Sequence, residues 1–292
     1  SRLAKEADMT EFVDVPGGRI ACDVDGSGPL VVLSHGIGDR RQAYRFLAPM
    51  LAQAGYRVAS VDLRGHGESS MGWASITRTD VAGDLLALTA HLGGPAVIAG
   101  HSLSGGAATI AAATRPDLVA GIVEINPFTR VPKTDLRGLL RVRRYRRCGF
   151  LLTGTQLFRS LGLWLRYLNL AYPAKPTDYA GYMTALAAKL REPGRMAEFL
   201  KTFKSTPADA EKQLPNVRCP ALVIVGTLDP DFPGPRAEGD AIVAAMPAGA
   251  GTVAMVDGAG HYPHAQSPEA VAELVIPFLK EHAGAQSGAD PR

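Results

Sequence analysis

Two serines stand two residues apart in the stretch VIAGHSLSGG, which runs from Val97 to Gly106. An apolar run ends at Ala99, and a run of small residues with helical character begins at Gly105. This pattern predicts a tight turn from a strand into a helix, which holds its corner residue in a strained conformation with the side chain exposed. A hydroxyl held in this way can act as a nucleophile once a neighbouring base removes its proton.

The end of the strand decides which serine occupies the corner. With the strand ending at Ala99, Ser102 falls at the corner and Ser104 already lies in the helix. Small residues are needed two positions before and after the corner, because strand and helix pass close together there. Gly100 and Ser104 meet this need for Ser102, although Ser104 stands where a second glycine is usual. A corner at Ser104 and a plain Gly/Ser turn are the alternatives.

Short apolar runs alternate with helical patterns along most of the chain. The expected strands are Leu30–Ser34, Val58–Val61, Ala96–Ala99, Gly121–Ile125, Ala221–Val225 and Thr252–Val256. Several are apolar throughout, which is typical of strands covered on both faces. Helical patterns include residues 43–54, 79–92, 105–113 and 268–282. This alternation predicts an α/β fold, with a mostly parallel twisted sheet flanked by helices.

One long segment departs from this alternation. Residues 128–213 carry an amphipathic helical pattern and no convincing strand. We expect them to form a helical cap, inserted into a core made of residues 1–127 and 214–284, with a disordered tail at 285–292. Ligands of open α/β sheets bind beyond the carboxyl ends of the strands, so an insertion there would act as a lid.

Size and composition are those of an ordinary globular protein. The 292 residues are 46% hydrophobic and 20% charged, and a net charge of +3 gives no reason to expect a nucleic-acid partner. No apolar run approaches the roughly 18 residues of a membrane span. The three cysteines show neither a disulfide framework nor a metal-ligand pattern. No Walker or Gly-x-Gly-x-x-Gly pattern follows the first expected strand and no metal constellation appears, so we expect no metal and no cofactor. We expect a cytoplasmic protein, although a start at Ser1 rather than Met leaves a removed signal peptide open.

Five motifs, each directly after an expected strand, carry a resemblance to a known superfamily. In chain order they are LSHGIGD, VDLRGHGES, GHSLSGG, VIVGTLDPD and VDGAGHYPH. In these motifs the chain resembles the α/β-hydrolase superfamily, over nearly its whole length apart from the insertion. The resemblance implies an α/β-hydrolase fold with a helical cap, and a catalytic triad in the chain order serine, acid, histidine.

Carried onto this sequence, the resemblance implies specific catalytic residues. Ser102 is the expected nucleophile, His261 the general base after the last strand, and Asp229 the carboxylate that orients the imidazole. The tetrahedral intermediate needs preorganised N–H donors for its oxyanion. The backbone amides of Leu103, directly after the nucleophile, and of Ile37, in the HGIG motif, are the expected donors.

Other residues could take two of these roles. His264 is the nearest rival for the base, although we expect it to border the pocket or to be solvated. His101 is expected to pack away from the corner serine. For the acid, Glu124 is a second candidate because some relatives take the acid from that strand. Asp231 is a further candidate, which we otherwise expect to cap a loop.

The cap sequence is basic. Ten Lys or Arg residues and one acidic residue, Asp135, lie between Arg130 and Arg166. We expect a solvated helix face; the alternatives are attraction of an anionic substrate or cofactor-linked acyl group, and contact with an anionic membrane surface. Interleaved apolar residues, such as Leu140 and Phe150, are expected to hold the cap to the core or to line an apolar acyl pocket.

Together these residues predict a serine hydrolase that cleaves a carboxylic ester of a small molecule, with an apolar acyl part, through an acyl-enzyme intermediate. The same triad could act on a thioester, a lactone or a carbon–carbon bond, or form peracids as haloperoxidase-like relatives do. Serine rather than aspartate at the corner argues against dehalogenase and epoxide hydrolase chemistry. A non-catalytic binding protein is the alternative from another class, but such proteins often lose a triad member. The sequence does not indicate the oligomeric state.

Overall fold

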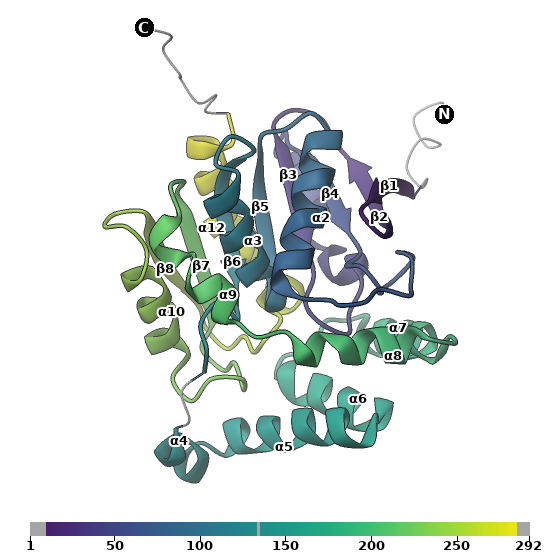
Figure 1. Cartoon of the computed structure of the whole chain (residues 1–292). Helices are drawn as coiled ribbons and strands as arrows, with labels where there is room; N and C mark the ends of the chain where they lie inside the picture. Colours follow the sequence, from purple (N-terminus) through teal and green to yellow (C-terminus); the bar gives the residue numbers. More distant parts are fainter. Residues whose placement is uncertain (1–9, 133–134, 285–292) are drawn as a thin grey trace, which may run out of the picture.

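The computed structural model describes residues 10–132 and 135–284, which are built around an eight-stranded sheet (Figure 1). The strands lie in the order β1-β2-β4-β3-β5-β6-β7-β8; pairs that involve β2 are antiparallel and all others are parallel. Their bounds are β1 Glu11–Val15, β2 Gly18–Asp25, β3 Leu30–Ser34, β4 Arg57–Val61, β5 Ala96–His101, β6 Val119–Ile125, β7 Ala221–Gly226 and β8 Gly251–Val256. The mostly parallel sheet confirms the fold class predicted from the sequence.

Helices cover both faces of this sheet. They are α2 (Arg78–His91), α3 (Leu103–Thr114) and α10 (Pro235–Ala244) on one face, and α1 (Leu47–Gln53) and α12 (Pro268–His282) on the other. Successive residues of the central strand β3 alternate between two hydrophobic clusters, with Val31 in one and Val32 in the other. Because both faces are covered, the central strands are apolar at every position.

The helix expected at residues 43–54 is interrupted. A 3-10 turn, η1 (Arg41–Tyr44), comes first, and α1 begins only at Leu47. Pro49, in the first turn of α1, has no N–H to donate to the carbonyl of Arg45, so the regular helix cannot extend back to Arg45.

Five helices between β6 and β7 form the cap, which lies across one end of the sheet (Figure 1). They are α4 (Leu136–Arg141), α5 (Arg143–Phe158), α6 (Leu161–Ala171), α7 (Tyr179–Arg191) and α8 (Arg195–Lys201). Short turns then lead back to the sheet: η2 (Thr202–Lys204), α9 (Ala208–Glu211) and η3 (Leu214–Asn216). A third hydrophobic cluster, with Trp164 and Phe199 of the cap and Tyr262 of the core, joins the two parts. The helical insertion predicted from the sequence is confirmed, whereas the tail expected at 285–292 lies outside the described residues.

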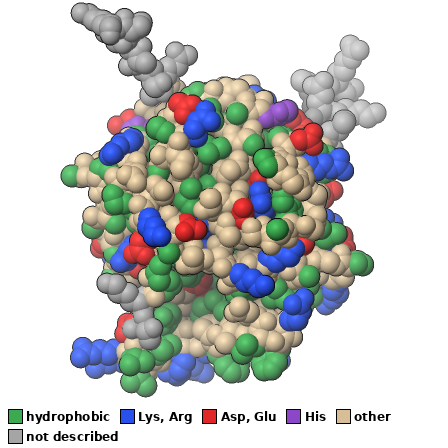
Figure 2. Space-filling view, viewed as in Figure 1, with side chains coloured by type: hydrophobic (Ala, Val, Ile, Leu, Met, Phe, Trp, Pro, Cys, Tyr) green, Lys and Arg blue, Asp and Glu red, His purple; other side chains and the backbone are tan. Residues whose placement is uncertain are grey.

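The expected packing of the cap's apolar residues is only partly correct. Trp164 and Leu168 are buried, but Leu140 and Phe150 are exposed. The latter two lie on the outer side of α4 and α5, which no other described element covers, so they cannot pack onto the core. Figure 2 shows apolar and basic side chains side by side along the edge of the molecule formed by the cap.

Within the described ranges, no helix has the length and apolar composition required to cross a membrane.

Candidate active site

Ser102 occupies a sharp turn between β5 and α3, with backbone angles φ 55° and ψ −118°. A positive φ is strained for a residue that carries a side chain. The turn is held by two backbone hydrogen bonds of 3.0 Å, from Ser102 N to Ile125 O and from Phe128 N to Ser102 O. A Cβ atom at Gly100 would lie 2.1 Å from the carbonyl oxygen of Ser104, so this position requires glycine.

The two serines of the turn have different surroundings. Ser104 is fully buried; its Oγ donates to the carbonyl of His35 at 2.6 Å and lies 2.9 Å from Ser34 Oγ. Ser102 instead lines a cavity of about 230 Å³ between the sheet and the cap. Of these two hydroxyls, the one on Ser102 is therefore the one that faces a space for substrate.

His261 and Asp229 lie together although 32 positions separate them in the chain. Nδ1 of His261 is 3.0 and 3.1 Å from the two carboxylate oxygens of Asp229, and both residues are buried. The loop that carries His261 also touches the cap, since His261 N donates to Ala171 O at 2.9 Å. A Cβ atom at Gly260 would lie 2.2 Å from that same carbonyl oxygen, so glycine is required for this close approach.

Asn126 ties the two loops of this pair together. Its side-chain amide donates to Gly260 O at 2.7 Å, and its side-chain oxygen accepts from Gly226 N at 2.8 Å. Gly226 ends β7, three residues before Asp229, and Gly260 precedes His261. Sequence reasoning missed this residue. The only sequence signal is weak. Asparagine after a strand is one of the few residues that tolerate a positive φ, and Asn126 has a φ of 41°.

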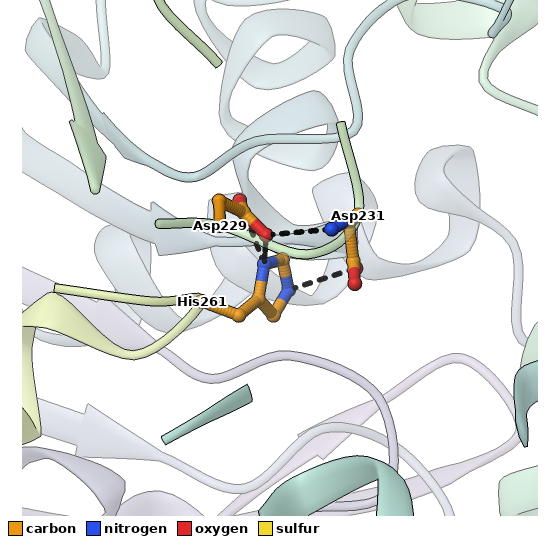
Figure 3. A group of neighbouring side chains, drawn as sticks. All are labelled: Asp229, Asp231 and His261. Atoms are coloured by element: carbon orange, nitrogen blue, oxygen red, sulfur yellow. Dashed lines mark hydrogen bonds and ion pairs between the residues drawn. The ribbon is translucent and has the colours of Figure 1, made fainter. Parts of the chain in front are cut away.

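A second carboxylate lies on the other side of the imidazole (Figure 3). Nε2 of His261 is 3.5 Å from Oδ2 of Asp231, the residue that we expected to cap a loop. The cap contributes two donors to this carboxylate: Tyr167 OH at 3.0 Å and Cys148 Sγ at 3.0 Å. The backbone amide of Asp231 also donates to Asp229 at 3.0 Å, which fixes the two acids relative to each other.

The expected hydrogen bond between Ser102 and His261 is not formed. Both side chains line the same cavity, but in the described part of the chain no hydrogen bond joins Ser102 Oγ to a ring nitrogen, and Nε2 faces Asp231 instead. Catalytic hydrogen bonds are often long or poorly aligned before substrate binds. For His261 to act on Ser102, its Nε2 must exchange Asp231 for the serine hydroxyl.

The two carboxylates change the pKa of the imidazole between them. Burial alone would lower the pKa of His261, but the negative charges of Asp229 and Asp231 and the hydrogen bond to Asp229 outweigh it and raise the pKa to about 9. Burial raises the pKa of Asp231 to about 6, although the charge of His261 opposes this rise. Near neutral pH the ring is therefore held in its charged form, paired on both sides.

Asp229, Asp231 and His261 form the one group of potential metal ligands found among the described residues, with ligand atoms within 4.8 Å of one another. However, each ring nitrogen already faces a carboxylate, and Asp231 is further held by Tyr167 and Cys148. A metal ion would have to displace these contacts. The donor set is thus that of a hydrogen-bonded relay, and we assign no metal to it.

The two expected oxyanion donors lie at the same cavity. Ile37 and Leu103 both line it. Leu103 begins α3, where the first backbone amides have no partner within the helix. Neither amide donates a hydrogen bond to another described residue, so both are free to bind a developing negative charge.

Arg78, at the start of α2, adds a buried cation to the cavity wall. Its Nε donates to Phe128 O at 2.8 Å, and its Nη1 donates to Ser205 Oγ at 2.9 Å. Among the described residues, no carboxylate lies within ion-pair distance of Arg78, and Nη2 makes no hydrogen bond. Burial lowers the pKa of Arg78 to about 10, opposed only by the charge of Asp209. No sequence motif pointed to Arg78.

The alternative site residues lie elsewhere. Glu124 accepts hydrogen bonds from Thr109 and Thr129 rather than from His261. The expectation that His264 borders the pocket or is solvated is wrong. It lies in α11 (Pro263–Gln266), is fully buried, does not line the cavity, and has its ring centroid 4.7 Å from those of Tyr44 and His101. 

His101 contacts the backbone of the loop that carries His261. It is buried, and its Nε2 lies 2.8 Å from the carbonyl oxygen of His261. Its ring packs 4.7 Å from the rings of His261, Tyr262 and His264, in agreement with the packing role expected from the sequence.

Comparison with known proteins agrees with this architecture. A family model described as "Alpha/beta hydrolase family" matches residues 31–274. The 2-(acetamidomethylene)succinate hydrolase of Mesorhizobium japonicum is 28% identical, over 95% of this chain and 97% of the relative. The (E)-2-((N-methylformamido)methylene)succinate hydrolase of Acinetobacter baylyi is 26% identical, over 87% and 92%. A thermophilic esterase from Thermogutta terrifontis superposes with a TM-score of 0.71 at 23% identity, over 94% of this chain and 99% of that one, which supports the fold alone.

The position of His261 between two acids predicts its titration. In the unmodified protein the imidazole should lose its proton near pH 9. Asp231→Asn should lower this midpoint, because removing a negative neighbour destabilises the imidazolium. Imidazole 15N shifts measured by NMR across the pH range would report it. Asp240→Asn, at an exposed carboxylate paired with Arg236, is the matched control and should leave the midpoint unchanged. An equal or higher midpoint in Asp231→Asn would contradict the assignment.

Proposed function

The chain belongs to the alpha/beta hydrolase family, and on this premise we propose that it is a serine hydrolase that cleaves a carboxylic ester through an acyl-enzyme intermediate. The observation that carries the proposal is the cavity shared by Ser102 and His261, with Asp229 paired to the far nitrogen of the same ring. These are the three groups that activate a weak hydroxyl nucleophile.

In the proposed acylation step, Ser102 Oγ attacks the ester carbonyl carbon while Nε2 of His261 takes the hydroxyl proton. The resulting oxyanion accepts hydrogen bonds from the amides of Ile37 and Leu103, and Asp229 stabilises the imidazolium. The intermediate collapses when the bond to the leaving oxygen breaks, and His261 returns the proton to the departing alcohol. Water then repeats the sequence on the acyl-enzyme, which releases the acid and restores Ser102.

Asp231 gives this cycle an additional step. In the free enzyme Nε2 faces Asp231, and a protonated ring cannot accept the serine proton. We infer that the ring passes its Nε2 proton to the carboxylate of Asp231 and then turns, neutral, to Ser102. Tyr167 and Cys148 can hold Asp231 in place when the ring leaves it.

A second candidate concerns the substrate rather than the chemistry. Both relatives described above are named for substituted succinates, which carry carboxylate groups. Arg78 favours such a substrate here, because a buried guanidinium without a carboxylate partner is suited to bind one. The scissile bond in this candidate is an ester or another acyl bond of an anionic molecule, rather than of one with the apolar acyl part expected from the sequence.

Covalent labelling tests the nucleophile. A fluorophosphonate probe should modify Ser102, and Ser102→Ala should lose both the label and roughly 10³- to 10⁶-fold of kcat for p-nitrophenyl butyrate. Ser104→Ala removes the neighbouring hydroxyl and should keep the label. Peptide mapping by mass spectrometry locates the adduct, and circular dichroism shows that both variants fold. A label on Ser104, or no label with full ester hydrolysis, would exclude the proposed mechanism; neither label nor turnover would favour a binding protein.

Matched substrates test Arg78. We expect Arg78→Met to lower kcat/KM for mono-p-nitrophenyl glutarate by about 10- to 100-fold, the usual effect of losing a hydrogen bond to a charged group. Turnover of neutral p-nitrophenyl hexanoate should change little, and Arg78→Lys should recover part of the loss. Arg236→Met, at an exposed arginine of α10, is the control. Because Arg78 also bonds to Phe128 and Ser205, equal losses on both substrates would show that it only supports the cap and would reject the anionic substrate.

A further inference from the structure

The outward side of the cap exposes large apolar side chains. Five residues of α4 and α5 are between 69% and 79% exposed: Leu136, Leu140, Phe150, Leu157 and Phe158. In the rest of the described chain, the most exposed large apolar side chain is Met71, at 44%. Apolar side chains gathered in this way mark a surface that is covered by a partner in use.

Positive charge is concentrated on the same part of the chain. Residues 136–177 contain nine Lys or Arg residues and no Asp or Glu. The rest of the chain contains the other 22 of the 31 basic residues and all 28 acidic residues, so its net charge is negative. The small overall charge of +3 is therefore the sum of a strongly positive cap and a negative core.

The two kinds of residue share one side of α5. At about 100° per residue, the exposed arginine, leucine and phenylalanine side chains of this helix fall within an arc of about 120°. They are Arg143, Arg146, Arg147, Phe150, Leu157 and Phe158. Cys148, Leu151 and Thr155 lie on a separate, buried side of the helix. We call the exposed arc, together with Leu136 and Leu140 of α4, the outer cap face (Figure 2).

A groove between α5 and α6 adds a place for an anion. It has a volume of about 660 Å³ and is lined by Arg146, Arg147, Phe150, Leu151, Arg166 and Asn169. Arg146 donates to the backbone carbonyl of Leu139 at 3.0 Å. Arg147 and Arg166 make no hydrogen bond or ion pair with any described residue. Arginine clusters of this kind bind phosphate groups.

We propose that the outer cap face docks on the surface of an anionic lipid bilayer. Phe150, Leu157 and Phe158 enter the region between headgroups and acyl chains, while Arg147 and Arg166 bind lipid phosphates in the groove. An apolar stripe with interleaved arginines is the pattern of helices that lie in a membrane interface, and basic residues beside them are attracted to anionic headgroups. This proposal is independent of the reaction at Ser102.

The charge of the face argues against a second copy of this chain as its partner. Two such faces would bring like charges together without an acidic residue between them, which opposes association. A polyanion such as nucleic acid would match the arginines but would leave the five apolar side chains without a partner. A bilayer with anionic headgroups matches both.

Co-sedimentation with lipid vesicles tests the proposal on the full chain. Binding should be strong to phosphatidylcholine vesicles that contain phosphatidylglycerol, weak to phosphatidylcholine alone, and reduced by added salt. The double variants Phe150→Ser/Phe158→Ser and Arg147→Gln/Arg166→Gln should each weaken binding by at least about tenfold. Phe12→Ser, at an exposed phenylalanine of β1, and Arg236→Gln, on α10, are the matched controls and should bind as the unmodified protein does. Circular dichroism and probe labelling check that every variant folds.

Several outcomes would overturn the proposal. These are absence of binding to anionic vesicles, equal binding to neutral ones, or unchanged binding by both double variants. A dimer seen by analytical ultracentrifugation that the Phe150→Ser/Phe158→Ser variant abolishes would instead assign the face to a second copy. Salt-sensitive binding to a single-stranded oligonucleotide that is tighter than binding to anionic vesicles would assign it to nucleic acid.

Discussion

The imidazole of His261 is shared between two buried carboxylates, and the rest of the site depends on that arrangement. Asp229 orients the ring through Nδ1, while Asp231 faces the nitrogen that the proposed mechanism needs for Ser102. With both acids charged, the imidazolium is strongly favoured, as its raised pKa reflects. In the free protein, the proposed nucleophile Ser102 therefore faces the cavity while its proposed base His261 is paired with Asp231.

The cap holds Asp231, one of the two carboxylates, in place. Tyr167 of α6 and Cys148 of α5 both donate to Asp231, and Arg144 of α5 donates to the backbone carbonyl of Asp229 at 3.4 Å. The inner side of α5 thus contacts the acid loop, and its outer side forms the proposed membrane-docking face. One helix joins the surface of the molecule to the carboxylate that competes with Ser102 for the ring.

The sequence predicted the parts of this site that depend on local pattern and chain order. The turn at Ser102 follows from an apolar run that stops before a cluster of small residues, and the expected positions of Asp229 and His261 came with the family resemblance. The position of Asp231 beside the ring could not be predicted, because Cys148 and Tyr167, which hold it, belong to the cap and lie 83 and 64 residues away in the chain. The roles of Asn126 and Arg78 likewise depend on contacts between distant segments.

The outer side of the cap could not be predicted from the sequence for a different reason. An amphipathic pattern indicates that a helix has an apolar side, but not whether the protein itself covers it. Leu140 and Phe150 were expected to pack inward, and only the placement of α4 and α5 at the edge of the molecule shows that they are exposed. Conversely, the break before α1 could have been predicted from Pro49, whose missing N–H is a local property.

In the proposed mechanism, His261 leaves Asp231 and turns to Ser102 during the reaction. A crystal structure of the protein after reaction with a fluorophosphonate tests it directly, because the adduct imitates the tetrahedral intermediate. We expect phosphonate on Ser102, with Nε2 of His261 within hydrogen-bond distance of the adduct and Asp231 still held by Tyr167 and Cys148. An adduct on Ser102 with the ring still paired to Asp231, out of reach of the phosphonate, would contradict it.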